Sequence, residues 1–216
     1  HSPPLPSGGC AMTALDRIRD AGVVASIREK SASEAASVLA ERVGGGLQAV
    51  EVSLVTPGAL VGVKAAAARA PDGVHIGVGT VLTVAEAEAA AECGATFIVA
   101  PTLDEGVVRA AVALGMDVLP GVATPTEAFR ATQAGASAVK LFPASLWSPA
   151  ALRDVRAAMP SLETVPTGGI SLDGLGEWIR SGALAVGLGS ALTRGGGTSE
   201  RIDHVLREVQ RAREAR

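Results

Sequence analysis

The feature that most constrains the fold is an alternation of short apolar runs with longer, Ala-rich amphipathic stretches. Each run is short enough for a parallel strand buried on both faces, which needs no polar alternation. Eight strand–helix units in 216 residues favour one closed (β/α)8 barrel, the TIM barrel, over an open doubly wound sheet. The predicted strands are Val23–Ile27, Ala49–Val52, His75–Val78, Phe97–Ala100, Val118–Leu119, Ala138–Leu141, Thr164–Pro166 and Leu184–Val186.

The amphipathic stretches have the end signals of helices. Gly94, Gly115 and Gly135 each follow one, at the position where a left-handed residue commonly ends a helix. An additional helix, Met12–Ala21, is predicted before the first strand. Residues 1–10 are expected to form a disordered tail, which leaves residues 11–216 as a single barrel domain. The other predicted helices are Ser33–Val43, Pro57–Ala70, Val84–Cys93, Asp104–Leu114, Thr124–Ala134, Pro149–Ala158, Leu175–Ser181 and Ser199–Arg213.

Composition argues against several classes of partner. The net charge is −3 and no basic stretch has interleaved aromatic residues, so nucleic acid is not expected as a partner. No apolar run reaches the roughly 18 residues of a membrane span, so no membrane association is expected. Cys10 and Cys93 are far apart and the three histidines are scattered, so we expect neither a disulfide framework nor a metal site. A reduced, cytoplasmic setting fits this pattern.

Lys140 is the strongest single signal of function. It lies inside the apolar strand Ala138–Leu141, where burial of an ammonium group is costly unless the group is paired or neutral. A desolvated lysine has a lowered pKa, which makes its amine a nucleophile near neutral pH. The chain has only three lysines against sixteen arginines, and a guanidinium group forms no Schiff base. The alternative is a structural lysine ion-paired with Glu51.

Glu51 is the other ionisable residue inside a predicted strand. A carboxylate near a Schiff-base lysine can move protons, directly or through a water molecule. The alternative, which does not exclude the first role, is a charge partner for Lys140 or Arg28.

Two glycine-containing turns follow the last two predicted strands, at Gly168-Gly169 and Gly189-Ser190. Glycine lets the backbone approach an anion closely, and the loops after strands 7 and 8 are the common phosphate site of a TIM barrel. The alternative is that both are tight turns only.

Several stretches together resemble the KHG/KDPG aldolase family. They include Lys140-Leu141-Phe142-Pro143 and Pro166-Thr167-Gly168-Gly169, and the resemblance runs from about Val23 to Leu192. Members of this family are 2-keto-3-deoxy-6-phosphogluconate aldolases, 4-hydroxy-2-oxoglutarate aldolases and relatives acting on 6-phosphogalactonate. The resemblance implies a (β/α)8 barrel, a homotrimer, and no metal or other cofactor.

The resemblance also assigns roles to individual residues. It implies that Lys140 is the Schiff-base lysine and that Glu51 is the general acid/base. It places Thr167 near the substrate carboxylate and three further residues in the pyruvyl pocket, namely Thr80, Pro101 and Phe142. It also assigns the phosphate-binding turns to Gly168, Gly169, Gly189 and Ser190.

One position departs from the commonest family pattern. Many members have Arg four residues after the glutamate, where this chain has Val55. Other members instead carry Arg at the end of strand 1, as Arg28 does here, so we expect Arg28 to hold an anionic group of the substrate. The alternative is an arginine at the rim of the barrel.

The predicted function is therefore that of a class I aldolase. It would cleave a 2-keto-3-deoxy-6-phospho sugar acid to pyruvate and glyceraldehyde 3-phosphate. A 4-hydroxy-2-oxoglutarate or 6-phosphogalactonate aldolase of the same family is the first alternative. Another phosphosugar barrel enzyme, such as an isomerase or a thiamin-phosphate-synthase-like transferase, and a non-catalytic sugar-phosphate sensor are the others. The sequence leaves open the stereochemistry at C4 and whether the phosphate is obligatory.

Overall fold

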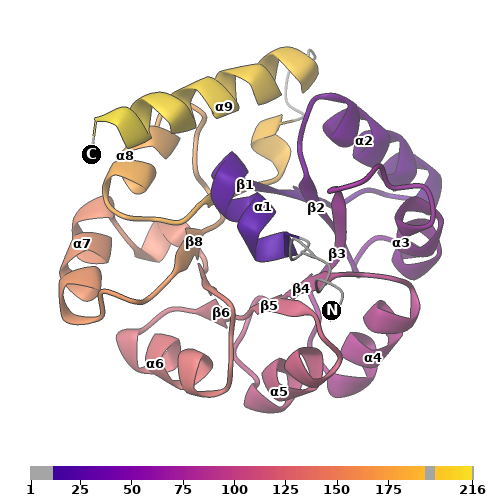
Figure 1. Ribbon diagram of the computed structural model, residues 1–216, viewed down its shortest axis with the longest axis horizontal. Helices are drawn as coiled ribbons and strands as arrows, with labels where there is room; N and C mark the ends of the chain where they lie inside the picture. The colour runs from indigo at the N-terminus through magenta and orange to yellow at the C-terminus, as the bar shows by residue number, and fades with distance from the viewer. Residues whose placement is uncertain (1–11, 193–197, 216) are drawn as a thin grey trace, which may run out of the picture.

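The computed structural model describes residues 12–192 and 198–215. The predicted tail, residues 1–10, lies outside these ranges, as does Cys10. The fold is α/β, with a parallel, curled sheet in the middle and helices around its outside (Figure 1). This agrees with the predicted strand–helix alternation.

All strand pairs of the structure are parallel. Six strands form one sheet in the order β5-β4-β3-β2-β1-β9, and three form a second sheet in the order β6-β7-β8. The strands are β1 (Val23–Ile27), β2 (Ala49–Ser53), β3 (His75–Gly79), β4 (Phe97–Val99), β5 (Asp117–Leu119), β6 (Gly121–Val122), β7 (Val139–Leu141), β8 (Thr164–Pro166) and β9 (Val186–Leu188).

The helices follow the predicted order. They are α1 (Ala14–Ala21), α2 (Ala32–Gly44), α3 (Ala59–Ala67), α4 (Val84–Glu92), α5 (Glu105–Ala113), α6 (Pro125–Gln133), α7 (Pro149–Ala158), α8 (Leu175–Arg180) and α9 (Thr198–Glu214), with the 3-10 helices η1 (Ala144–Leu146) and η2 (Ser190–Leu192). The glycines predicted to end helices have positive φ, for example 83° at Gly94 and 76° at Gly115, as a left-handed C-terminal position requires.

Several predicted boundaries differ from the observed ones by one to three residues, and three of these differences have a clear local cause. The N-cap of α2 is Ser31, whose hydroxyl accepts a hydrogen bond from Glu34 N–H, and not Ser33. Helix α3 does not begin at the predicted Pro57: its N-cap is Gly58, with φ 72°, and its first residue is Ala59. The last strand is Val186–Leu188, since the ladder with β1 starts at Val23↔Val186. Leu184 and Ala185 are buried as well, at 7 % and 0 % exposed, so burial alone did not identify the residues that pair.

The fifth strand was predicted to end at Leu119, but strand structure resumes at Gly121, after Pro120, which has no N–H to donate to a ladder. Before it, β5 pairs with β4, and after it, β6 pairs with β7. The carbonyl of Pro120 still accepts a hydrogen bond from Lys140 N–H, at 2.8 Å. The chain thus passes from one sheet to the other at this proline.

Helix α1 covers the end of the curled sheet at which the strands begin, and it crosses the middle of the ring in Figure 1. The N–H of Leu15 donates to the carboxylate of Asp117, the first residue of β5, at 2.8 Å. Ile18 of α1 packs with Val24, Phe97 and other strand residues in a buried cluster. The opposite end, where the strands finish, is the usual place for function in parallel α/β folds of this kind.

No helix within residues 12–192 and 198–215 has both the length and the apolar character needed to cross a membrane.

Candidate active site

Lys140 lies in the middle of β7, with 9 % of its surface exposed. Its Nζ is 4.6 Å from the centre of the Phe142 ring, which is a cation–π distance. Burial lowers the pKa of the Lys140 amine, the charge of Glu51 opposes this shift, and the charge of Arg28 adds to it. The local environment therefore favours the neutral, nucleophilic amine.

Glu51 lies at the centre of β2 and is 4 % exposed. Burial raises the pKa of its carboxyl group, and Lys140, the Ser26 hydroxyl and Arg28 act in the opposite direction. Its Oε2 has no hydrogen-bond partner among the residues described. Within residues 12–192 and 198–215, no ion pair joins Glu51 to Lys140 or to Arg28. Glu51 is thus a desolvated carboxyl group near an amine, with an oxygen available to a further partner.

The position of Glu51 depends on a glycine in the neighbouring strand. β3 runs beside β2, with Gly79 paired to Ser53. A Cβ atom on Gly79 would lie 1.4 Å from Oε2 of Glu51. Gly187 has the same relation to Thr167, because a Cβ there would lie 2.1 Å from the Thr167 hydroxyl oxygen. Both glycines are needed for space, a role that the sequence analysis missed although glycine inside a strand often signals close approach.

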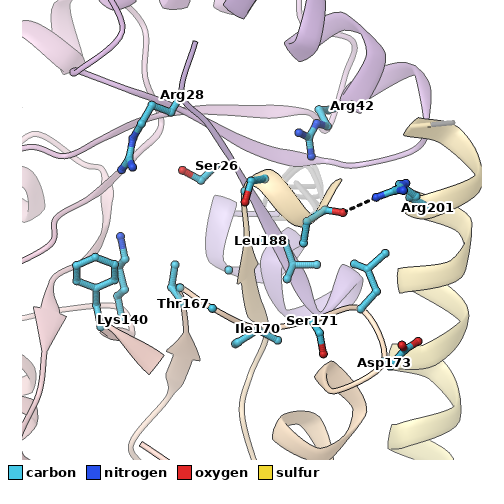
Figure 2. Close-up of a pocket in the computed structure, with 18 of the residues that line it drawn as sticks. Ser26, Arg28, Arg42, Lys140, Thr167, Ile170, Ser171, Asp173, Leu188 and Arg201 are labelled. Atoms are coloured by element: carbon cyan, nitrogen blue, oxygen red, sulfur yellow. Dashed lines mark hydrogen bonds between the residues drawn. The ribbon is translucent and has the colours of Figure 1, made fainter. Parts of the chain in front are cut away.

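A cavity of about 880 Å³ opens at the carboxyl end of the strands. Figure 2 shows Arg28 and Lys140 at one side of it, with the guanidinium of Arg28 directed toward Lys140. Arg28 is exposed and immediately follows β1. The predicted site residues that line the cavity are Arg28, Lys140, Phe142, Thr167, Gly168, Gly169, Gly189 and Ser190.

Thr80 and Pro101 are at the same end of the sheet, just after β3 and β4, but they are not among the residues that line the cavity. The Thr80 hydroxyl lies 2.6 Å from that of Ser53, and Thr80 has a left-handed φ of 61°. Val55 is 54 % exposed and does not line the cavity either.

The first glycine turn adopts a backbone conformation that other residues rarely reach, with φ values of 93° at Gly168 and 82° at Gly169. In the second turn Gly189 does not have a positive φ, and Ser190 is the first residue of η2. The helix after the first turn, α8, begins at Leu175, as predicted, and has six residues. Five residues separate Gly169 from this helix, so an anion bound at the first turn would meet the turn itself.

The cavity also contains residues that the sequence analysis did not propose. They include Ser26, which is paired with Glu51 in the register. They also include Arg42, Asp173 and Arg201, at the far side in Figure 2, and His204. Ser26 could have been found from its place near the end of a predicted strand. Arg42 and the others come from helices and loops, where a polar residue usually indicates no more than a solvated face.

No three His, Cys, Asp or Glu side chains come together as metal ligands in residues 12–192 and 198–215. The arrangement offers a buried amine and a cation that line one end of a large cavity, and a buried carboxyl group, Glu51, that interacts with the amine but is not among the residues lining the cavity. These groups can form a covalent bond to a carbonyl carbon, move protons and hold an anion.

Comparison with known proteins gives one consistent result. The family described as "KDPG and KHG aldolase" matches residues 15–206. The probable 2-dehydro-3-deoxy-6-phosphogalactonate aldolase of Rhizobium meliloti is 38 % identical over 81 % of this chain and 82 % of its own length. The 2-dehydro-3-deoxy-phosphogluconate aldolase of Treponema pallidum is 37 % identical over 77 % of this chain and 78 % of its own.

A solved structure called "Native KDPGal structure" superimposes with a TM-score of 0.79 at 35 % identity, covering 89 % of this chain and 94 % of that one. The family match spans most of the chain, and relatives more than 30 % identical are covered over more than two thirds of their length. The chain therefore belongs to the KDPG and KHG aldolase family.

Proposed function

We propose that the protein is a class I aldolase that cleaves a 2-keto-3-deoxy-6-phospho sugar acid to pyruvate and glyceraldehyde 3-phosphate through a Schiff base on Lys140. The observation that carries this proposal is the burial of the Lys140 amine within β7, which lowers its pKa, close enough to the buried Glu51 for each group to shift the pKa of the other. Membership of the aldolase family supports the same reaction class.

The reaction begins when the neutral amine of Lys140 attacks the C2 ketone and forms a carbinolamine. Loss of water, with protons moved by Glu51, gives an iminium ion. The iminium withdraws electrons while the C3–C4 bond breaks, Glu51 takes the proton of the C4 hydroxyl group, and the aldehyde leaves. The remaining enamine takes up a proton at C3, and water then releases pyruvate and restores the amine. Because burial raises its pKa, Glu51 holds a proton more readily than an exposed carboxyl group, which suits a group that both gives and accepts protons.

The other predicted residues bind and position the substrate in this proposal. Arg28 holds the carboxylate or the phosphate through its planar guanidinium. Thr167 contacts the carboxylate end. Phe142, Thr80 and Pro101 surround the pyruvyl portion, and the phosphate meets the turns at Gly168, Gly169, Gly189 and Ser190. Support for this set comes from the cavity, which most of these residues line.

A 2-keto-3-deoxy-6-phosphogalactonate substrate is the second candidate. One observation favours it: the relative at 38 % identity acts on the phosphogalactonate compound by its name. A 4-hydroxy-2-oxoglutarate substrate is a third candidate within the family.

We propose in addition that residues 11–216 form one closed (β/α)8 barrel. Support comes from contacts between the edges of the two sheets. Thr167 bridges to Gly187, the N–H of Leu184 donates to Thr164 O at 2.9 Å, and the N–H of Ser137 donates to Val118 O at 3.1 Å. With β5 and β6 counted as one strand, the order closes on itself. A homotrimer, which rests on the resemblance, and a cytoplasmic location, which rests on the cysteine pattern, also stay proposals. Exposed apolar side chains such as Phe129 and Leu146 are of the kind that subunit contacts cover.

The direct test is trapping with pyruvate and sodium borohydride, followed by peptide mapping. Hydride reduces the iminium to a stable secondary amine, and we expect this adduct on the peptide that contains Lys140. Lys140→Met should abolish the adduct, whereas the matched variant Lys64→Met, on α3, should retain it. An unmodified protein, or an adduct on Lys30 or Lys64, would contradict the proposal. An isomerase, a thiamin-phosphate-synthase-like transferase or a non-catalytic sensor would give no adduct.

A further inference from the structure

Arg42 is a buried charged residue that the proposed reaction does not use. It lies in the last turn of α2 and is 1 % exposed. Its Nε and Nη1 have no hydrogen-bond partner within the described ranges, and no ion pair involves it there. It lines the cavity, and Figure 2 shows its guanidinium nitrogens directed into it.

An arrangement of this kind is costly for a folded protein. Buried charges are normally paired, and a buried polar group without a partner in a native structure calls for an explanation. The charges of Glu29 and Glu41 act to raise the pKa of Arg42, but burial has the larger effect and lowers this pKa. Arginine stays protonated in proteins. The guanidinium is therefore a cation with unused hydrogen-bond donors, facing a cavity.

The surroundings of Arg42 indicate what kind of ligand would meet it. In Figure 2 it lies near Arg201, on the side of the cavity away from Lys140. The turn of Gly189 and Ser190 lines the same cavity. Arg201 has a different role, because its Nη1 donates to Ala191 O at 3.0 Å and so ties α9 to η2. Phosphate oxygens match the fork of an arginine, and the donors of a guanidinium bind them in pairs.

We propose that Arg42 is a specificity-determining residue that binds the phosphate group of the substrate, so that the enzyme prefers phosphorylated 2-keto-3-deoxy acids over their unphosphorylated forms. The substrate class rests on the proposed function. An unphosphorylated acid leaves the guanidinium buried and unpaired in the complex, and a site built to hydrogen-bond a group discriminates strongly against an analogue that lacks it. Arg42 thus acts on selectivity at the phosphate, far from the bond that breaks.

The first test compares kcat/KM for one acid in its phosphorylated and unphosphorylated forms. In Arg42→Met, which keeps much of the side-chain length without the charge, the preference for the phosphorylated form should fall about 10- to 100-fold, the loss expected for a charge-assisted hydrogen bond. Arg42→Lys should retain part of it. The control is Arg180→Met, at an exposed arginine in the last turn of α8 and outside the cavity, which should keep the wild-type preference. An equal loss on both forms in Arg42→Met would make Arg42 merely structural and overturn the proposal.

The second test needs no turnover. Inorganic phosphate should raise the melting temperature of the wild-type protein relative to chloride at equal ionic strength, because a ligand of the folded state stabilises it. The rise should shrink in Arg42→Met and persist in Arg180→Met. An equal rise in all three proteins would overturn the proposal. The absence of a rise in the wild-type protein would also overturn it, and this result does not depend on whether a variant folds. Trapping with pyruvate and borohydride is independent of Arg42, so its failure would reject the aldolase mechanism and leave the phosphate measurement to decide on Arg42.

Discussion

Gly79→Ala provides a sharp test of the role of Glu51, because it adds one methyl group and removes no functional atom. The added Cβ would lie 1.4 Å from Oε2 and 2.4 Å from Cδ of Glu51, whereas ordinary contacts begin at 3.4 Å, so the carboxyl group must retreat by about 2 Å. A misplacement of about 1 Å can cost roughly 10²-fold in rate. General acid/base catalysis contributes about 10²- to 10⁴-fold. We therefore expect kcat to fall by about 10²- to 10⁴-fold.

The fold should tolerate the same change much better. Gly79 does not have a positive φ, so alanine meets no backbone strain, and the clash is with the end of a side chain. Overpacking of this kind costs about 1–3 kcal/mol of unfolding free energy. The assay is steady-state cleavage followed by pyruvate release, with circular dichroism and urea unfolding on the same samples.

The matched control is Gly62→Ala in α3, where the added Cβ would have only Ala32 O within 4 Å, at 3.9 Å. It should leave kcat unchanged and add about 0.5–1 kcal/mol of stability, as alanine does in a helix. A folded Gly79→Ala enzyme with wild-type kcat would refute the reasoning, because it would show that turnover does not depend on where the Glu51 carboxyl group lies.

Two further predictions concern single charged groups. Glu51→Gln should lower kcat by about 10²- to 10⁴-fold with the fold retained. Burial raises the pKa of Glu51 in the folded state above its ordinary 4.5. The contribution of protonated Glu51 to the unfolding free energy is therefore fully present below pH 4.5 and is lost as pH rises through the folded-state pKa. Urea unfolding should thus show the glutamine variant gaining stability relative to wild type over that range, and parallel pH profiles would contradict this. Arg28→Ala should lower kcat/KM by about 10- to 100-fold with Arg28→Lys in between, as loss of a charge-assisted contact implies, and an unchanged kcat/KM on every family substrate would leave Arg28 without a role in binding.

Much of the fold and part of the site could be predicted from the sequence, because both depend on local patterns. Short apolar runs separated by amphipathic stretches with glycine ends indicate parallel strands and helices whatever their neighbours are. A lysine or a glutamate inside such a run is conspicuous, because the same run that predicts burial makes an ionised group costly there. Lys140 and Glu51 were identified for this reason, and the structure places both in buried strand interiors. Their catalytic roles stay predictions.

The tertiary structure decided what depends on distant segments. The start of β9 follows from its pairing with β1, since Leu184 and Ala185 are buried as well but do not pair. The need for glycine at position 79 arises only because Glu51 points at it from the neighbouring strand. Arg42 occupies the last turn of a helix, where a basic residue is ordinary. Periodicity tells which residues share a face, but whether that face meets solvent, a core or a cavity depends on what packs against it, and only the assembled structure reveals a buried guanidinium there.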